Sequence, residues 1–239
     1  MQKDNRPYIV RLLVENFYKF WSKHFLIPQF KRVGKNLDVN KPWNIDVYGN
    51  NISIGENVHI RTSKNLITQL CSWNKNNCDG VIKIGDNVLI SPGVRIISAK
   101  EIIIKSNVMI ASNVYISDSD WHGIYDRVNT PGLSQNITIE ENSWIGEGSK
   151  ISKGVKIGKN SIIGLGSVVT SNVPDNEIFG GNPAKKIGEI DKNKKIRKRE
   201  DLFLNNDYNK LMKFLIKEDL KENNFFAWLR VLFFPKKGD

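Results

Sequence analysis

Residues 139–170 read IEENSWIGEGSKISKGVKIGKNSIIGLGSVVT, and an isoleucine or valine stands at every sixth position of this stretch. The recurring residues are Ile139, Ile145, Ile151, Ile157, Ile163 and Val169. A small or short polar residue follows most of them. Because an α-helix repeats about every 3.6 residues and a strand every two, the pattern fits neither.

A period of six is typical of a coil with three flat faces, each of which turns one apolar side chain inward. Three such faces make a turn of roughly 18 residues, so residues one turn apart stack on each other. A β-sandwich is the alternative, but strand spacing in sandwiches is not locked to six residues. The same spacing recurs at Ile84, Ile90, Ile96, Ile104, Ile110 and Ile116, and more weakly at Ile54 and Ile60.

Glycine is frequent where such a coil needs corners. A corner requires a positive φ angle or a backbone without a crowding Cβ, and glycine accepts both. We therefore expect corners at Gly55, Gly85, Gly93, Gly146, Gly148, Gly154, Gly158, Gly164 and Gly166.

Four segments carry a resemblance to a known family: IGDNVLI at 84–90, WIG at 144–146, IGLGSVVT at 163–170 and GNPAK at 181–185. Over about residues 50–188 the chain resembles the hexapeptide-repeat acyltransferases. Among these it is similar to the maltose and galactoside O-acetyltransferases and the sugar O-acetyltransferases of polysaccharide synthesis. The resemblance implies a left-handed parallel β-helix, a homotrimer and acetyl-CoA as the acyl donor.

Length and cysteine content set further limits. A chain of 239 residues can bury one long core or two small ones, and the repeat favours one. Cys71 and Cys78 lie in a polar stretch without a histidine partner, which does not fit a zinc site, so we expect no metal and a reducing cytoplasm. Because neither a signal peptide nor a run of about 18 uncharged apolar residues is recognisable, we expect a cytoplasmic rather than an integral membrane protein.

The formal net charge of +11 is concentrated at the two ends. Residues 1–35 carry +6, residues 189–239 carry +4, and residues 36–188 carry +1. We therefore divide the chain into an N-terminal amphipathic helical segment (1–36), an all-β acyltransferase domain (37–188) and a basic C-terminal helical extension (189–239).

The local patterns predict two helices and two excursions from the coil. One helix should span residues 7–27, beginning at Pro7 and ending near Pro28, and a second, amphipathic helix should span residues 200–221. The stretches at 68–77 and 117–136 break the repeat and should form loops. Loops on a rigid scaffold are where binding and catalytic groups concentrate.

Acyl transfer from a thioester to a sugar hydroxyl needs a base, which histidine commonly supplies. His24 and His59 are interpreted as structural. His122 lies in SDSDWHG at 117–123, where the resemblance places the catalytic histidine. A carboxylate or carbonyl should hold its other ring nitrogen, with Asp120 preferred over Asp118 and a main-chain carbonyl left open. No motif indicates an acyl-enzyme, so we expect direct attack on the thioester, with backbone N–H groups at the oxyanion.

The resemblance also implies positions for the two substrates. For CoA it implies residues that line the cleft between neighbouring coils of the trimer: Trp144, Gly146, Leu165, Thr170, Lys185 and Lys186. The two lysines would bind the phosphates. For the acceptor we expect Ser91, Trp121 and Arg127. The chain departs from the maltose and galactoside enzymes at two positions. Ser91 stands where those enzymes have an acceptor-binding asparagine, and Ser171 stands where a basic residue is expected.

The sequence thus predicts an O-acetyltransferase acting on a cell-surface saccharide or its precursor. The alternatives are an N-acetyltransferase acting on an amino-sugar nucleotide, which needs the same base and donor, and a non-catalytic scaffold. A carbonic anhydrase with the same coil is excluded, because its zinc site requires three histidines and the repeat contains two. Nucleic-acid binding lacks a recognition motif.

The two ends combine positive charge with dense aromatic clusters, around residues 17–25 and 225–234. Bulky rings can sink to the headgroup boundary of a membrane while lysine and arginine meet anionic lipid. This predicts peripheral attachment at the inner face of the membrane. The alternative is that both segments pack against each other or against a neighbouring protomer.

Overall fold

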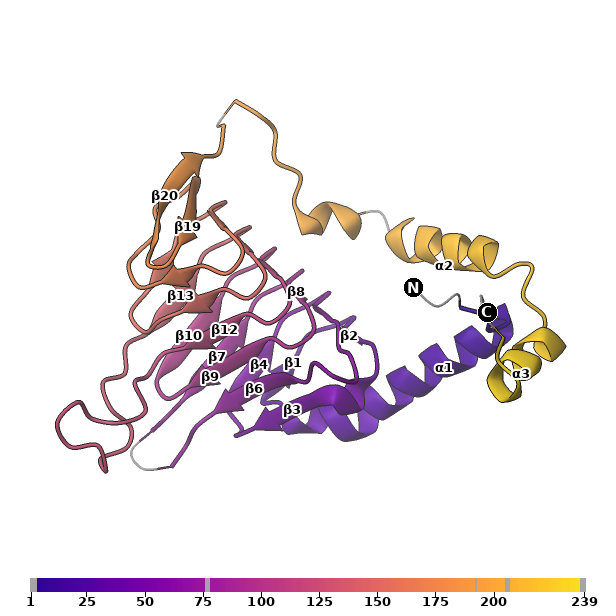
Figure 1. Ribbon diagram of the computed structural model, residues 1–239, viewed down its shortest axis with the longest axis horizontal. Coiled ribbons are helices and arrows are strands. Elements are labelled where there is room, and N and C mark those ends of the chain that lie inside the picture. The colour runs from indigo at the N-terminus through magenta and orange to yellow at the C-terminus, as the bar shows by residue number, and fades with distance from the viewer. Residues whose placement is uncertain (1–3, 76–77, 192, 205–206, 237–239) are drawn as a thin grey trace.

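The computed structural model describes residues 4–75, 78–191, 193–204 and 207–236. The chain winds into a coil of three sheets, and helices extend from one end of the coil (Figure 1). The predicted fold class, an all-β left-handed parallel β-helix with helical extensions at both termini, is confirmed.

Successive strands go to the three sheets in turn. Sheet A contains β1 (Arg32–Val33), β4 (Ile52–Ile54), β7 (Val81–Ile84), β10 (Glu101–Ile104), β13 (Ile137–Ile139) and β16 (Lys156–Ile157). Sheet B contains β2 (Asp38–Val39), β5 (His59–Ile60), β8 (Leu89–Ile90), β11 (Met109–Ile110), β14 (Trp144–Ile145), β17 (Ile162–Ile163), β19 (Glu177–Gly181) and β20 (Ala184–Glu189). Sheet C contains β3 (Ile45–Tyr48), β6 (Thr68–Ser72), β9 (Arg95–Ser98), β12 (Tyr115–Ser117), β15 (Lys150–Ile151) and β18 (Val168–Val169).

The register of the coil follows the six-residue period. Ile139 lies opposite Ile157, one turn further on, and the next two pairs of the repeat keep the same offset. The recurring residues of this stretch are 0–1% exposed. Since burying one such side chain contributes about 1.5–3 kcal/mol, the column of stacked aliphatic residues is the main source of stability.

Asparagines form the corner at which the chain passes from sheet A to sheet B, the A–B corner. Their φ angles of 53–65° lie in the left-handed region, which asparagine tolerates better than most residues. Neighbouring amides hydrogen-bond from turn to turn over 2.9–3.1 Å. The prediction that glycines supply the corners was therefore incomplete. This ladder contains Asn36, Asn57, Asn87, Asn107, Asn142, Asn160 and Asn176.

The N-terminal helix leads directly into the coil. Helix α1 spans Tyr8–Trp21 and continues through a π-helical turn (Ser22–Leu26) and a 3-10 turn (Ile27–Gln29), close to the predicted helix 7–27. Leu26 and Phe30 are buried against the first turn of the coil. Because β1 begins at Arg32 and belongs to sheet A, the coil begins a few residues before residue 37, the predicted start of the acyltransferase domain.

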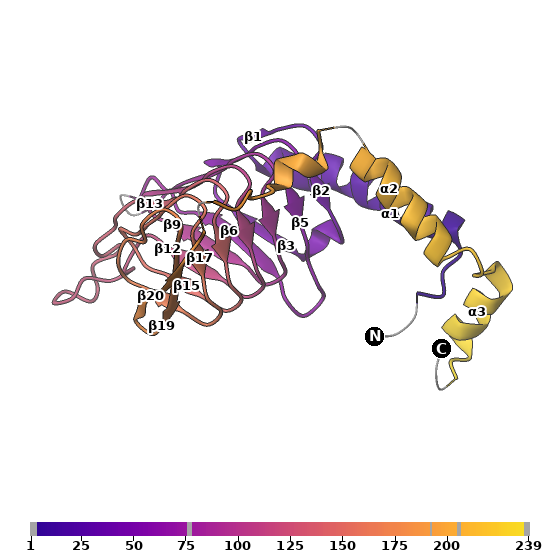
Figure 2. The same cartoon turned by 90° about the horizontal axis from the view of Figure 1, so that it is seen from above.

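The other end of the coil is closed by the antiparallel hairpin of β19 and β20. The chain then returns along the coil through a 3-10 turn (Arg199–Leu202) to α2 (Asp207–Asp219) and α3 (Phe225–Phe233), as Figure 2 shows. The predicted helix 200–221 corresponds to this 3-10 turn and α2. The intervening residues 205–206 lie outside the described residues.

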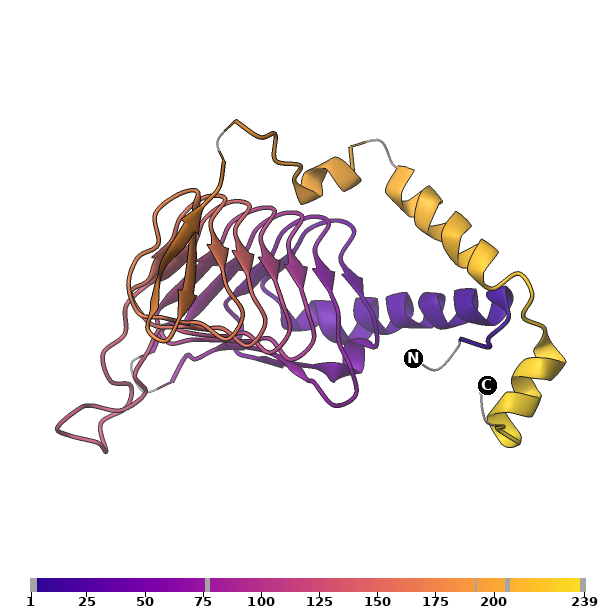
Figure 3. The same cartoon turned by 45° about the horizontal axis from the view of Figure 1, so that its top comes forward.

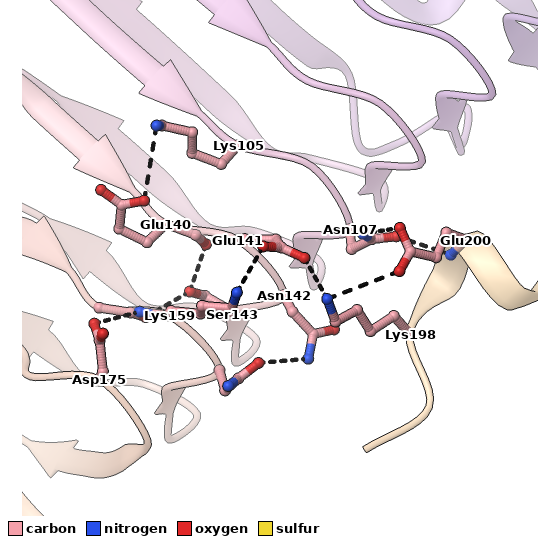
Figure 4. A network of polar contacts seen from close by, with 12 residues as sticks. Lys105, Asn107, Glu140, Glu141, Asn142, Ser143, Lys159, Asp175, Lys198 and Glu200 are labelled. Carbon is pink, nitrogen blue, oxygen red and sulfur yellow. Dashed lines mark hydrogen bonds and ion pairs between the residues drawn. The ribbon is translucent and has the colours of Figure 1, made fainter. Parts of the chain in front are cut away.

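Residues 198–203, which we call the strap, fasten the returning chain to the A–B corner (Figure 4). The Lys198 ammonium forms ion pairs with Glu141 and Glu200. The amide of Asn107 and residue Glu200 bond reciprocally: the Glu200 N–H donates to Asn107 Oδ1 over 2.8 Å, and Asn107 Nδ2 donates to Glu200 Oε2 over 3.1 Å. The asparagine ladder thus also holds the C-terminal extension.

Candidate functional site

Both excursions leave the coil at the same corner, where the chain passes from sheet C to sheet A, the C–A corner. Residues 73–80 connect β6 to β7, and residues 118–136, the His122 loop, connect β12 to β13. Figure 1 shows the His122 loop projecting from the coil, on the side away from the helices. One tight corner, residues 98–100, separates the two excursions.

Asp118 is a structural residue at the base of the His122 loop. It is fully buried, and its carboxylate accepts hydrogen bonds from Ser98 Oγ (2.7 Å), Ala99 N (2.7 Å) and Lys100 N (3.0 Å). The carboxylate therefore ties the loop to the tight corner of the preceding turn. The structure does not support the predicted role of Asp118 in orienting His122, because His122 Nδ1 contacts the Arg127 oxygen and the Asp118 carboxylate binds these donors.

Asp120 fastens the same loop to the following turn. Its carboxylate forms an ion pair of 2.6 Å with the ammonium of Lys153 at the next C–A corner. Asp120 was predicted to orient His122, but in the structure its carboxylate pairs with Lys153. The base of the loop is thus held on both sides by carboxylates.

A main-chain carbonyl, the alternative left open, holds His122. Its Nδ1 lies 2.9 Å from the carbonyl oxygen of Arg127 in the same loop. A carbonyl only accepts, so Nδ1 carries the proton and the neutral ring keeps its lone pair on Nε2. The imidazole is exposed beside an open hollow lined by His122, Gly123, Ile124 and Arg127. The geometry suits a general base.

Trp121, which precedes His122, adopts a rarely populated backbone conformation. Its φ of 65° is unusual for a bulky residue and costs of order 1–3 kcal/mol. The conformation is held by the indole N–H, which donates to Ser117 Oγ over 3.0 Å, and by the Trp121 N–H, which donates to Ser119 Oγ over 3.1 Å. This bend fixes the direction in which the chain enters His122.

The indole of Trp121 also joins an aromatic row that the sequence analysis did not assign. Its ring centroid lies 5.7 Å from that of Trp73, which lies 5.0 Å from that of Tyr48. Trp73 belongs to the first excursion, so the row connects the two loops. A tryptophan inside a polar, asparagine-rich loop was the signal that could have indicated it. We call Tyr48, Trp73 and Trp121 the aromatic row.

The residues predicted to bind CoA lie mainly at another corner. Trp144 on β14 and Leu165 are 47% and 83% exposed, and Leu165 and Gly146 lie where the chain passes from sheet B to sheet C, the B–C corner. Gly146 has a structural reason of its own, because a Cβ there would meet the Ile163 oxygen at 2.5 Å. Thr170 instead follows β18 at the C–A corner.

The two predicted phosphate-binding lysines differ in their surroundings. Both lie on β20 and are exposed. The ammonium of Lys186 forms ion pairs with Glu177 and Glu189, and the hydrogen bond that it donates to Glu177 is the main cause that raises its pKa. Two carboxylates at Lys186 disfavour a phosphate there, so the structure does not support this part of the prediction. Lys185 fits the role better.

The predicted acceptor residues are split in the same way. Trp121 and Arg127 lie in the His122 loop, whereas Ser91 follows β8 at the B–C corner, where its N–H donates to the Ile110 oxygen over 2.9 Å. Within one chain, the structure therefore brings His122 together with Trp121 and Arg127 but not with Ser91 or Trp144.

His59 is packed into the scaffold. Its ring is buried and lies edge-on to Phe203 of the strap, with centroids 5.4 Å apart. Burial, assisted by the positive charge of Arg61, lowers the pKa of His59 to about 4. The imidazole is therefore neutral at physiological pH and serves to dock the strap. Over the described ranges, no three or more His, Cys, Asp or Glu side chains gather closely enough to hold a metal ion.

Comparison with known proteins agrees with this architecture. Residues 136–171 match the family model described as bacterial transferase hexapeptide (six repeats). No curated protein sequence matches the chain. The predicted resemblance to the hexapeptide-repeat acyltransferases is confirmed by this repeat match, which lies within the coil.

Several solved structures resemble the chain. A variant of AntD, an N-acyltransferase from Bacillus cereus, in complex with dTDP-4-amino-4,6-dideoxyglucose and coenzyme A, has a TM-score of 0.60 at 22% identity, covering 80% of this chain and 97% of that one. AntD with dTDP and 3-hydroxybutyryl-CoA has a TM-score of 0.54 at 20% identity, covering 80% and 96%. A maltose O-acetyltransferase from Clostridium difficile 630 has a TM-score of 0.44 at 24% identity, covering 80% and 92%. The two AntD structures share the fold of this chain.

Proposed function

We propose that this acyltransferase uses acetyl-CoA to acetylate a hydroxyl group of a cell-surface saccharide or its precursor. The observation that carries the proposal is the contact of His122 Nδ1 with the Arg127 carbonyl, which leaves Nε2 available as a base. The imidazole stands on a loop fastened to a rigid coil at both sides. Such fixed placement is what a general base needs to meet a bound hydroxyl.

The proposed reaction is a direct transfer. The acceptor hydroxyl loses its proton to His122 Nε2 as its oxygen forms a bond to the acyl carbon. The carbon–sulfur bond then breaks, and the departing thiolate takes the proton from the imidazolium. The Arg127 carbonyl stabilises the imidazolium by accepting from Nδ1, which is the part that a carboxylate has in a catalytic triad.

The site is incomplete within one chain, and we propose that a homotrimer completes it. His122 lies at the C–A corner, whereas Trp144 and Leu165 lie at or beside the B–C corner of the triangular coil. Two large apolar side chains exposed on a rigid scaffold favour burial by a ligand or a partner copy. In a cyclic trimer, the B–C corner of one copy can face the C–A corner of the next.

The donor site would then contain Trp144 and Leu165 as apolar contacts and Lys185 as the phosphate ligand. Small residues at the B–C corner let the pantetheine arm of CoA approach the backbone. Thr170 lies at the C–A corner, on the same edge of the coil as the His122 loop but two turns further on, and not at the corner of Trp144. We therefore assign Thr170 to the side of the cleft that the His122 chain supplies.

We propose the aromatic row as the acceptor platform. The apolar face of a sugar ring packs against aromatic rings, and Trp73 is partly exposed beside the loop that carries His122. Trp121 links the platform to the base, because it is the neighbour of His122 in the chain. Arg127 is exposed in the same loop and can meet a charged or hydroxyl-rich acceptor.

N-acylation of an amino-sugar nucleotide is the second candidate. It is favoured by the shared fold with AntD, an N-acyltransferase whose structure contains a dTDP-linked amino sugar. The same base can take a proton from an amine. The two candidates differ in the acceptor and not in the arrangement at His122.

An assay of thiol release from acetyl-CoA separates the candidates. The purified chain is incubated with envelope saccharides on one side and with amino-sugar nucleotides on the other, and products are identified by mass. We expect alkali-labile O-acetyl products. Amide products would favour the second candidate. A chain that neither releases thiol nor gains thermal stability from CoA would be a scaffold, and the proposal would be wrong.

A further inference from the structure

Helix α1 exposes one continuous apolar stripe. Ile9, Leu13, Phe17 and Phe20 recur at spacings of three or four residues, which places them on one helix face. Ile9 and Leu13 are each 61% exposed, and the two phenylalanines are about half exposed. No residue of α1 is buried. Phe17 also contacts the ring of Trp43, with centroids 6.1 Å apart, and the described part of the chain leaves most of this face exposed.

Positive charge borders the stripe. Lys19 and Lys23 are exposed beside it, and neither forms an ion pair among the described residues. The acidic groups near α1 are already neutralised by arginines: Asp4 pairs with Arg6, and Glu15 pairs with Arg11. The exposed face of α1 thus combines large apolar side chains with uncompensated cations.

The C-terminal helix α3 also exposes large apolar side chains. Phe226 is 81% exposed, and Phe233 and Phe234 are also largely exposed. Its sequence, FFAWLRVLF, contains no acidic residue, and Arg230 lies in its last turn. Over its nine residues, α3 is too short to span a bilayer but long enough to lie on one.

The two helices lie at the same end of the molecule, away from the His122 loop (Figure 3). The side-chain amide of Asn223, just before α3, donates to the carbonyl oxygens of Asp4 (2.6 Å) and Arg6 (3.0 Å), just before α1. This contact joins the two termini. No helix of the described chain is long and apolar enough to cross a membrane.

We propose that α1 and α3 together bind the surface of a membrane that contains anionic lipid. Each helix lies in the interface, with its phenylalanine, leucine and isoleucine side chains at the acyl boundary. Lys19 and Lys23 meet the negatively charged headgroups. The proposed trimer would present three copies of this surface, which strengthens a weak attachment.

The charge distribution favours a membrane over a second copy of the chain as the occupant. Residues 1–35 carry +6 and residues 189–239 carry +4, so two such ends repel each other. Interfaces between protein copies are also depleted in lysine. An anionic bilayer offers an apolar layer for the exposed aliphatic and aromatic side chains and negative charge for the lysines.

Sedimentation with vesicles tests the inference on the full chain. Vesicles of phosphatidylcholine with phosphatidylglycerol are compared with vesicles of phosphatidylcholine alone, at low and high salt. We expect binding to the anionic vesicles that weakens as salt rises. Replacing Lys19 and Lys23 by glutamine should weaken binding by about fivefold for each lysine.

A matched pair of variants separates the helix face from general effects of charge. Leu13→Glu places a carboxylate in the stripe, and Ile67→Glu makes the same change at an exposed aliphatic residue of the coil, which is 52% exposed. We expect at least a tenfold loss of vesicle binding for Leu13→Glu and less than a twofold change for Ile67→Glu. Phe226→Glu repeats the test on α3 should Leu13→Glu fail to fold.

Three results would overturn the inference. The first is no sedimentation of the full chain with anionic vesicles at low salt. The second is equal binding by Leu13→Glu and Ile67→Glu. The third is dissociation of the oligomer by Leu13→Glu, seen by light scattering, which would make a second copy the occupant of the stripe. Acetyl transfer to soluble acceptors is measured in parallel, so that failure here is distinct from failure of the proposed activity.

Discussion

The Nδ1 atom of His122 lies 2.9 Å from the main-chain oxygen of Arg127, five residues further along the same loop. The proposed base is therefore oriented by the backbone of its own loop and not by an acidic side chain. Because the carbonyl belongs to the main chain, no substitution of the Arg127 side chain removes it. The position of the imidazole depends on the fold of the loop between these two residues.

Replacing His122 by alanine should lower turnover by roughly 10²-fold to 10⁴-fold, the usual contribution of a general base. The proposed donor contacts Trp144, Leu165 and Lys185 lie outside the His122 loop, so CoA binding and oligomeric state should be unchanged. Thiol release gives turnover, and calorimetry gives the affinity for CoA. Near-normal turnover by the variant would remove His122 from the mechanism.

Asp120→Asn should reduce turnover less than tenfold. Its carboxylate pairs with Lys153 at 2.6 Å, whereas a carboxylate that orients a catalytic histidine costs about 10⁴-fold when changed to asparagine. Lys153→Met is the matched control, because it breaks the same ion pair from the other side. If Asp120→Asn lost activity by 10³-fold while Lys153→Met did not, the carboxylate would have to reach His122 in the working enzyme.

Asp118→Ala should lower the free energy of unfolding by roughly 3–5 kcal/mol, because three donors of residues 98–100, two of them in buried hydrogen bonds, lose their acceptor. Asp118→Asn keeps an acceptor oxygen and should cost less. Urea denaturation measures both. Asp126→Ala, an exposed change in the same loop, should alter stability by under about 0.5 kcal/mol. Equal effects at the two positions would contradict the structural role of Asp118.

The sequence predicted the coil well because its period acts at every turn. One inward aliphatic residue per face, as at Ile139 and Ile157, determines the strand register independently of the loops. The asparagine ladder was missed because each of its residues, taken alone, looks like any loop asparagine. Only the contact between neighbours, such as the hydrogen bond from Asn160 to Asn176, shows the ladder.

The site was predicted in part for a related reason. His122 could be found from its loop, but its partner depends on how that loop folds back to Arg127. Asp118 and His122 are close in sequence, yet the carboxylate turns into the coil. Lys186 pairs with Glu177 only through the register of the β19–β20 hairpin. Such contacts cannot be derived from residue spacing alone.

Trp73→Ala should raise the KM for the saccharide roughly threefold to tenfold, the range expected for one aromatic contact, and leave the KM for acetyl-CoA unchanged. The reason is the position of Trp73 in the aromatic row, 5.7 Å from Trp121. Steady-state kinetics with each substrate varied in turn supply the two constants. Trp73→Phe keeps a ring and should recover most of the affinity. A change in the donor KM instead would place Trp73 outside the acceptor site.

Stability should depend on pH through His59, whose pKa is lowered to about 4 by burial and by Arg61. The unfolded chain takes up a proton near pH 6.5, whereas the folded chain does so only near pH 4. The stability that the neutral ring contributes is therefore complete above pH 6.5 and is lost as pH falls toward 4. Between pH 7 and pH 4.5 the loss should be roughly 2–3 kcal/mol.

His59→Gln isolates this contribution, because glutamine does not titrate and the carboxylates of the chain remain the same. We expect the variant to lose roughly 2–3 kcal/mol less stability than the natural chain between pH 7 and pH 4.5, measured by urea denaturation at one protein concentration. Its stability at pH 7 should be lower, since it loses the ring contact with Phe203. Identical pH dependence in the two proteins would show that His59 is protonated alike in the folded and unfolded chains, and that the strap does not require a neutral ring.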